Sequence, residues 1–125
     1  MHTHILPAKL PRFADKFGYG DFIYLKSRED GAADMMKGDA FFRTIQSNCW
    51  DEKLRIEEYA EYQTQVQVVC TIPVMFSYWA KGADCLELSR FLNDHIAQLA
   101  KDNPKHYIGL GTVPMQDTDL AIKEL

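Results

Sequence analysis

The chain has 125 residues, the length of one ordinary domain. Hydrophobic residues make up 46% of it and charged residues 26%, which are the proportions of a globular protein with a buried core. The net charge is −4 and the basic residues are scattered, so the sequence lacks the basic stripe that nucleic-acid binding requires. The longest apolar stretch, Val66 to Ala80, is too short and too interrupted to span a membrane.

The chain opens with Met1-His2-Thr3-His4, and this His-x-His pair is its most informative feature. Residues i and i+2 of a strand point to the same face, with Cα atoms roughly 6.6 Å apart. Two imidazoles at this spacing can bind one metal ion, but a catalytic zinc usually has three protein ligands, so the others must come from elsewhere. By itself the spacing also fits a frayed terminus or the remnant of a tag.

The segment from about residue 11 to residue 48 is rich in glycine and differs from the rest of the chain. It contains two short β-type runs, Phe22–Leu25 and Ala40–Ile45, and Gly38-Asp39 is a candidate turn before the second run. We therefore expect a small antiparallel flap inserted after the first strand. Insertions at the carboxyl ends of parallel strands usually form the mouth of an active site.

Helices and strands alternate after this segment, and successive strands begin some forty residues apart, which is typical of βαβ units with a parallel sheet. The expected elements are a helix capped by Asp51 and running to about Gln63, a strand over Thr64–Ile72, a helix over Asp84–Asp102, a strand over His106–Val113, and a helix from Thr118 capped by Asp117.

Two of the expected helices have a one-sided apolar pattern. In the helix that follows Asp51, this apolar edge consists of Ile56, Tyr59 and Ala60. In the helix over Asp84–Asp102, the predicted buried face consists of Leu88, Phe91, Leu92, His95 and Leu99. We therefore expect a structural role for His95, and also for His106, which precedes a buried strand.

The chain has three cysteines, Cys49, Cys70 and Cys85, with no Cys-x-x-Cys spacing. An odd number of widely spaced cysteines favours free thiols over a disulfide framework. Free thiols are typical of a reducing compartment, so we expect the protein in the cytosol.

Several blocks of sequence, in this order, closely resemble the family of 2-amino-3-carboxymuconate-6-semialdehyde decarboxylases, which are metal-dependent TIM barrels of the amidohydrolase superfamily. The resemblance covers nearly the whole chain and weakens at Lys26–Met36. The blocks that carry it are His2-Thr3-His4-Ile5-Leu6-Pro7, Phe42-Arg43, Asn48-Cys49-Trp50-Asp51, Pro73-Val74-Met75-Phe76-Ser77-Tyr78-Trp79-Ala80, Leu92-Asn93-Asp94-His95 and Gly109-Leu110-Gly111-Thr112-Val113-Pro114-Met115-Gln116.

The resemblance implies a zinc-dependent lyase. Such an enzyme removes CO2 from a small dicarboxylate semialdehyde in the kynurenine branch of tryptophan breakdown and so limits formation of quinolinate. By position, His2 and His4 match the first two Zn2+ ligands. Arg43 matches the arginine that binds a substrate carboxylate, and Lys37 and Phe42 match residues that line the pocket. The family's other metal ligands, its acid/base histidine and an arginine from the partner subunit of the homodimer would lie beyond residue 125, so we expect no catalytic residue within this chain.

The predicted fold is α/β: the N-terminal portion of a metal-dependent (β/α)8 TIM barrel with a small antiparallel β insertion after its first strand. A complete barrel takes about 250 residues, so we expect residues 1–125 to be one part of a single domain, cut at both ends. Alone, this part should lack decarboxylase activity and fold poorly, because its last strand presents an open edge. Two alternatives remain: another amidohydrolase-related decarboxylase or hydrolase, and a non-catalytic truncated product.

Overall fold

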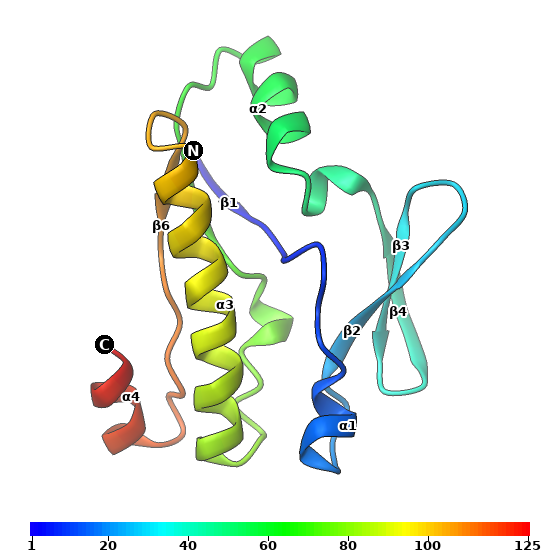
Figure 1. Cartoon of the computed structure of the whole chain (residues 1–125), viewed down its shortest axis with the longest axis vertical. Coiled ribbons are helices and arrows are strands. Elements are labelled where there is room, and N and C mark those ends of the chain that lie inside the picture. Colours follow the sequence, from blue (N-terminus) through cyan, green and yellow to red (C-terminus); the bar gives the residue numbers. More distant parts are fainter.

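The centre of the fold is a three-stranded parallel sheet with strand order β1-β5-β6 (Figure 1). The computed structural model describes all 125 residues, Met1–Leu125. Strand β1 spans His2–His4, β5 spans Gln67–Cys70 and β6 spans Tyr107–Gly109. These strands lie within the predicted ones and are shorter, because the parallel pairing extends only from His2 opposite Val68 to His4 opposite Cys70, and from Gln67 opposite Tyr107 to Val69 opposite Gly109.

Two helices of the βαβ part begin at their predicted caps, Asp51 and Asp117. Helix α2 spans Glu52–Glu61, and the Asp51 carboxylate accepts hydrogen bonds from two backbone N–H groups of its first turn. Helix α4 spans Thr118–Glu124, and the Asp117 carboxylate accepts one hydrogen bond, from the Leu120 N–H. The longest helix, α3 (Gly82–Asp102), runs alongside the parallel sheet (Figure 1). None of the helices is long and apolar enough to cross a membrane.

The buried face of α3 is rotated relative to the sequence prediction. The predicted residues Leu88, Leu92 and Leu99 are buried, but Phe91 and His95 lie half-exposed at the edge of the face. A cysteine, a serine and an isoleucine that were not predicted complete the face. The buried set is Cys85, Leu88, Ser89, Leu92, Ile96 and Leu99.

Residues 23–45 form a second sheet, which is antiparallel with strand order β2-β3-β4. Strand β2 spans Ile23–Ser27, β3 spans Ala33–Lys37 and β4 spans Ala40–Ile45. Strand β4 has the predicted bounds, whereas β3 was not predicted, since Ala-Asp-Met-Met-Lys contains no β-branched residue. Gly38, with φ of 59°, and Asp39 form the two-residue turn between β3 and β4.

A short helix, α1 (Phe13–Phe17), precedes the antiparallel sheet and ends at Gly18, whose φ is 77°. The helix has only five residues, too few for a helical pattern to be visible in the sequence. One hydrophobic cluster joins α1, the antiparallel sheet and the first half of α3 through residues that include Phe13, Phe22 and Leu88. A smaller cluster lies between the parallel sheet and the second half of α3.

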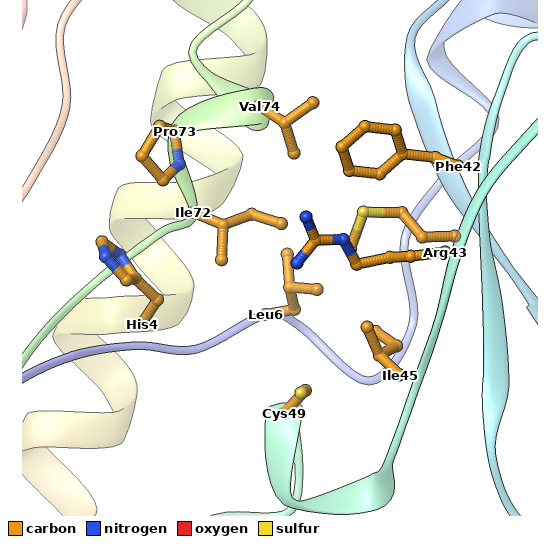
Figure 2. Close-up of a pocket in the computed structure, with 10 residues that line it drawn as sticks. His4, Leu6, Phe42, Arg43, Ile45, Cys49, Ile72, Pro73 and Val74 are labelled. Carbon is orange, nitrogen blue, oxygen red and sulfur yellow. The ribbon is translucent and has the colours of Figure 1, made fainter.

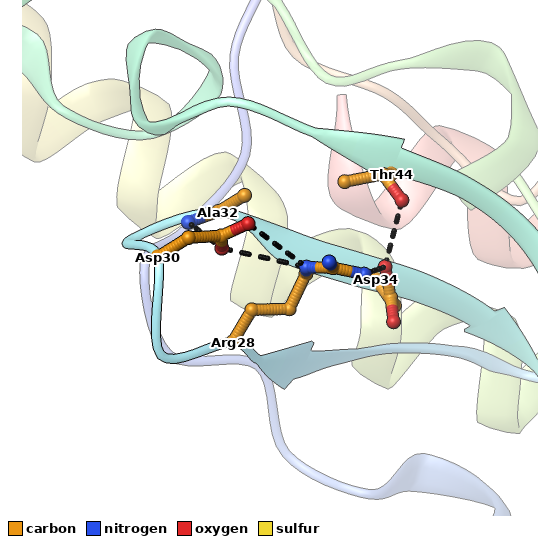
Figure 3. Close-up of polar contacts among 5 residues, drawn as sticks. All are labelled: Arg28, Asp30, Ala32, Asp34 and Thr44. Atoms are coloured by element: carbon orange, nitrogen blue, oxygen red, sulfur yellow. Dashed lines mark hydrogen bonds and ion pairs between the residues drawn. The ribbon is translucent and has the colours of Figure 1, made fainter.

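A polar network stabilises the turn between β2 and β3 (Figure 3). The Arg28 side chain contacts Asp30 and Asp34 at 3.3 Å each, and the Thr44 hydroxyl donates to Asp34 at 2.8 Å. The Asp30 carboxylate also accepts from the Ala32 N–H. The hydrogen bond from Thr44 and the Arg28 charge hold the pKa of Asp34 below its ordinary value. This network links all three strands of the sheet.

Of the apolar edge predicted for α2, Ile56 packs half-buried against the smaller cluster, whereas Ala60 is exposed. The one fully buried residue of the helix is Arg55. Its Nη2 donates to Thr3 Oγ1 at 2.9 Å and to Gln67 Oε1 at 3.1 Å, and its Nη1 donates to the Asn48 carbonyl at 2.8 Å. No carboxylate pairs with this guanidinium. Arg55 therefore joins β1, β5 and the start of α2 behind the sheet, on the side that Thr3 faces.

We predict that Arg55→Met destabilises the chain by about 2–4 kcal/mol, because it leaves several buried acceptors without a donor. The measurement is urea unfolding followed by tryptophan fluorescence. Lys26→Met, at an exposed position of β2, is the control and should change the free energy of unfolding by no more than about 0.5 kcal/mol. An Arg55→Met protein as stable as the original would show that the buried charge costs as much as its hydrogen bonds contribute.

Candidate functional site

His2 and His4 lie side by side on one face of β1, while Thr3 between them is buried on the other face. Their ring centroids are 5.3 Å apart, and both side chains are exposed. The alternation follows from the pleat of the strand. The two imidazoles are therefore close enough to bind one ion, as the His-x-His spacing predicts.

Cys70, at the end of β5, completes a cluster with these histidines. Its Sγ lies 3.3 Å from His2 Nε2 and 3.3 Å from His4 Nδ1, and the ligand atoms of all three residues lie within 4.8 Å of one another. Burial raises the pKa of the Cys70 thiol above its ordinary value. Two imidazoles and a thiol are donors of the kind that Zn2+ binds in proteins, so the residues present fit a zinc ion.

No local sequence pattern identifies Cys70 as a neighbour of the histidines. The register of the parallel pairing between β1 and β5 decides where the thiol lies, because a one-residue shift would turn it to the opposite face. The structure aligns His4 with Cys70. His4 Nδ1 also lies 3.1 Å from the Thr71 carbonyl, a contact that orients the ring.

A pocket of about 390 Å³ opens beside His4, between the parallel sheet and the antiparallel sheet (Figure 2). This volume is in the range of small-molecule sites. Most of its wall is apolar, and no carboxylate lines it. The lining residues are His4, Leu6, Met35, Phe42, Arg43, Ile45, Cys49, Ile72, Pro73 and Val74.

Arg43 extends from β4 into this pocket, with its guanidinium among apolar side chains (Figure 2). It forms no ion pair, and its Cζ lies 4.9 Å from the centre of the Phe42 ring. An unpaired guanidinium in an apolar pocket is suited to bind an anion, and its planar fork fits a carboxylate bidentately.

Phe42 and Arg43 are consecutive residues of a strand, yet both line the pocket. The cause is a break in the pairing between β3 and β4. Met35 lies opposite Arg43 and Met36 lies opposite Phe41, so Phe42 is an extra residue of a β-bulge. A bulge of this kind locally removes the alternation of side chains and redirects one of them.

Lys37 does not line the pocket that contains Arg43, in contrast to the sequence-based expectation. It lines a neighbouring cavity together with Asp21 and Tyr78. The two cavities share Pro73 and Val74 as wall residues. Lys37 ends β3 beside the turn at Gly38, which places its side chain at the outer end of the hairpin.

No family model matches the chain, but curated proteins do. The chain is 50% identical over 125 residues to a 2-amino-3-carboxymuconate-6-semialdehyde decarboxylase of Dictyostelium discoideum, covering all of this chain and 35% of that protein. It is 41% identical over 123 residues to the protein of the same name from Caenorhabditis elegans, covering 98% of this chain and 31% of that protein.

The chain is homologous to the N-terminal part of the 2-amino-3-carboxymuconate-6-semialdehyde decarboxylases. This confirms the resemblance inferred from the sequence blocks. The chain spans about a third of the length of these two curated relatives.

A solved structure, that of a putative amidohydrolase from Staphylococcus aureus, shares the fold with a TM-score of 0.52 and 20% identity over 62% of this chain and 26% of that one. The mixed α/β arrangement therefore fits a partial TIM barrel.

The chain's other two histidines, His95 and His106, lie away from the pocket. His95 lies on α3 and contacts a cavity beside Trp50 and Lys53, and His106 lies beside Gln65, whose carbonyl is 3.3 Å from its Nδ1. Burial lowers the pKa of His95 below its ordinary value of 6.5, and its Nδ1 is buried without a hydrogen-bond partner. Neither histidine lines the pocket that contains His4 and Arg43.

We predict that His95 makes the chain sensitive to mild acid. Because the unfolded chain protonates this histidine more readily than the folded chain, stability is full above pH 6.5 and falls as pH decreases from 6.5 toward the lower folded-state pKa. The slope reaches at most about 1.4 kcal/mol per pH unit. His95→Leu and His95→Gln should both flatten the dependence measured by urea unfolding between about pH 5.5 and 7.5. An unchanged slope in both variants would assign the sensitivity to other groups.

Proposed function

We propose that this chain forms the metal-binding and substrate-binding part of a zinc-dependent decarboxylase that converts 2-amino-3-carboxymuconate 6-semialdehyde to 2-aminomuconate 6-semialdehyde. The observation that carries the proposal is an unpaired arginine, Arg43, in one apolar pocket with a histidine of the His-x-His pair, His4. The names of the two curated relatives support the same reaction. In tryptophan breakdown through kynurenine, this reaction limits formation of quinolinate.

In this proposal Arg43 holds one carboxylate of the substrate. The guanidinium supplies two parallel N–H donors, so it fixes the plane of the carboxylate as well as its position. Phe42 lies beside the guanidinium, whose Cζ is 4.9 Å from the centre of the Phe42 ring. The apolar wall residues, Leu6 and Ile72 among them, contact the carbon skeleton. Lys37 has no role in this proposal because it lines the adjacent cavity.

His2 and His4 would hold the zinc ion, which supplies Lewis acidity and activates water near neutral pH. The other groups of the pocket act on the substrate itself. Although Arg43 is exposed to solvent, a carboxylate held there exchanges part of its hydration for oriented N–H donors. The chain offers no acid/base residue at this pocket, so proton transfer is assigned to residues of the longer protein.

We further propose that the complete protein is a homodimer in the cytosol, which takes a small dicarboxylate semialdehyde and binds neither nucleic acid nor membrane. All three cysteines are free, in keeping with a reducing compartment. The homodimer is what the family resemblance implies.

The proposal is tested in a hybrid in which residues 1–125 replace the corresponding N-terminal part of the Dictyostelium relative. With zinc bound, the hybrid should consume the semialdehyde faster than the spontaneous cyclisation that yields quinolinate. Residues 1–125 alone should show no such turnover, because the proton-transfer group is absent from their pocket. Turnover by residues 1–125 alone would contradict this assignment, and a folded, zinc-loaded hybrid without turnover would contradict the proposed reaction.

We predict that Arg43→Ala in the hybrid lowers kcat/KM by about a hundredfold while zinc content stays normal, because the charge-assisted bidentate contact is lost. Arg43→Lys should restore little, since an ammonium cannot reproduce the planar fork.

The matched control for Arg43→Ala is Lys26→Ala, which removes an exposed cation of β2 outside the pocket and should leave kcat/KM unchanged. Loss of zinc or of folding in Arg43→Ala would assign Arg43 a structural role instead.

A further inference from the structure

Strand β1, which carries both histidines of the His-x-His pair, is paired along one edge only. It has three residues and its one partner is β5, since the strand order is β1-β5-β6. Thr3 is the residue of this strand that faces away from the histidines, and it is buried. A contact to Thr3 therefore acts on the backbone that His2 and His4 share.

A buried guanidinium makes this contact from α2. Arg55 Nη2 donates to the Thr3 hydroxyl oxygen at 2.9 Å and to Gln67 Oε1 of β5 at 3.1 Å. The Thr3 hydroxyl donates to the same Gln67 oxygen at 3.4 Å, so the three side chains form a closed set of hydrogen bonds. Because the N–H groups of a guanidinium have fixed directions, Arg55 holds one strand in place relative to the other.

The other terminal nitrogen of this guanidinium reaches the wall of the proposed substrate pocket. Arg55 Nη1 donates to the Asn48 carbonyl at 2.8 Å, within the short 3-10 helix η1 (Ser47–Cys49). The next carbonyl, that of Cys49, accepts from the Leu6 N–H at 2.9 Å. Leu6 and Cys49 both line the pocket. Arg55 thus connects the strand of the histidine pair to the substrate side of the site.

The burial of this charge is not explained by the filling of space. Arg55 is only 6% exposed, no carboxylate pairs with it, and its Nε is buried without a hydrogen-bond partner. An apolar side chain of similar volume would avoid the cost of removing a charge from water. An apolar side chain, however, could not fix the direction and distance of Thr3, Gln67 and the Asn48 carbonyl.

We propose that Arg55 is a positioning residue for the metal-binding histidine pair. It holds Thr3 on one face of β1, so that His2 and His4 project from the opposite face toward one ion. Arg55 itself touches neither metal nor substrate, since it contacts the face of β1 opposite the histidines. This inference rests on the metal-binding part of the proposed function, and it gives a helix residue outside the pocket a share in metal retention.

The test uses the zinc-loaded hybrid with the Dictyostelium relative and measures the rate at which zinc passes to an added chelator. Arg55→Lys keeps the charge but cannot reach three acceptors, and Thr3→Val keeps the volume of the side chain but lacks its hydroxyl. Both should release zinc at least about tenfold faster, at the lower end of the roughly 10–100-fold effect of outer contacts on metal affinity. Thr3→Ser retains the hydroxyl and should release zinc at close to the original rate.

The matched control is Leu88→Ala. It opens a cavity in the larger hydrophobic cluster, to which no residue of β1 belongs, and so destabilises the fold while leaving the hydrogen bonds of Arg55 intact. Its zinc release should stay close to the original rate. Release from Leu88→Ala as fast as from Arg55→Lys would show that zinc retention follows overall stability, and would overturn the role of Arg55.

Hydrogen exchange followed by mass spectrometry gives a readout that does not depend on zinc. In the hybrid, Arg55→Lys and Thr3→Val should each speed exchange in the segment Met1–Leu6 by about tenfold, the size expected for the loss of one or two hydrogen bonds. This segment responds because the Ile5 and Leu6 N–H groups donate to β5 and to η1.

The segment Tyr107–Leu110 is the internal control for this exchange. It pairs with β5 on the edge away from β1, so its exchange should be unchanged in both variants. Equal acceleration in the two segments would assign Arg55 a contribution to overall stability alone and overturn the inference.

The outcomes separate this inference from the proposed function. If the original hybrid retains zinc and both variants release it at the original rate, the role of Arg55 is overturned and the histidine pair remains the metal site. If the original hybrid fails to bind zinc, the metal-binding part of the proposed function is overturned, and the inference with it.

Discussion

The site depends on the parallel pairing of β1 with β5. Strand β1 has only three residues, and its register with β5 places His4 opposite Cys70. On the other face, Arg55 donates hydrogen bonds to Thr3 of β1 and to Gln67 of β5. The same two strands are thus held together by their backbone ladder and by one buried guanidinium, and the orientation of both histidines follows from that pairing.

The second determinant of the site is the contact between the two sheets. The antiparallel sheet packs against the βαβ part through a common hydrophobic cluster, in which Leu6 lies two residues after the His-x-His strand and Met35 belongs to β3. This packing leaves an apolar pocket lined by the Arg43 guanidinium and the His4 imidazole. The exposed guanidinium of Arg43 presents parallel N–H donors that fit a carboxylate.

The division of roles within the longer relatives is consistent with this geometry. The chain spans about a third of their length, and this third contains the histidine pair, the thiol and the arginine. None of its histidines outside the pair reaches the pocket. In the proposed enzyme, this segment would thus position metal and substrate, while later segments would supply the proton-transfer chemistry.

Local sequence patterns determined the features that depend on neighbouring residues. The caps at Asp51 and Asp117 are visible because a helix N-terminus needs a nearby acceptor, and the run Ala40–Ile45 is visible because its residues favour extended backbone. The common face of His2 and His4 follows from the two-residue period of any strand. The sequence blocks also sufficed to identify the family, since their order and spacing are carried by the chain itself.

Only the tertiary structure decided the features that depend on register and packing. Cys70 meets His4 across 66 residues of sequence, and no local pattern specifies that alignment. Arg55 is buried with its Nη2 donating to Thr3 and Gln67, although a charged residue in an amphipathic helix is ordinarily exposed. Phe42 joins Arg43 in the pocket through a bulge, whereas Lys37 lies outside it. Strand pairing and burial are properties of distant segments in contact, and for that reason these residues could not be assigned from the sequence.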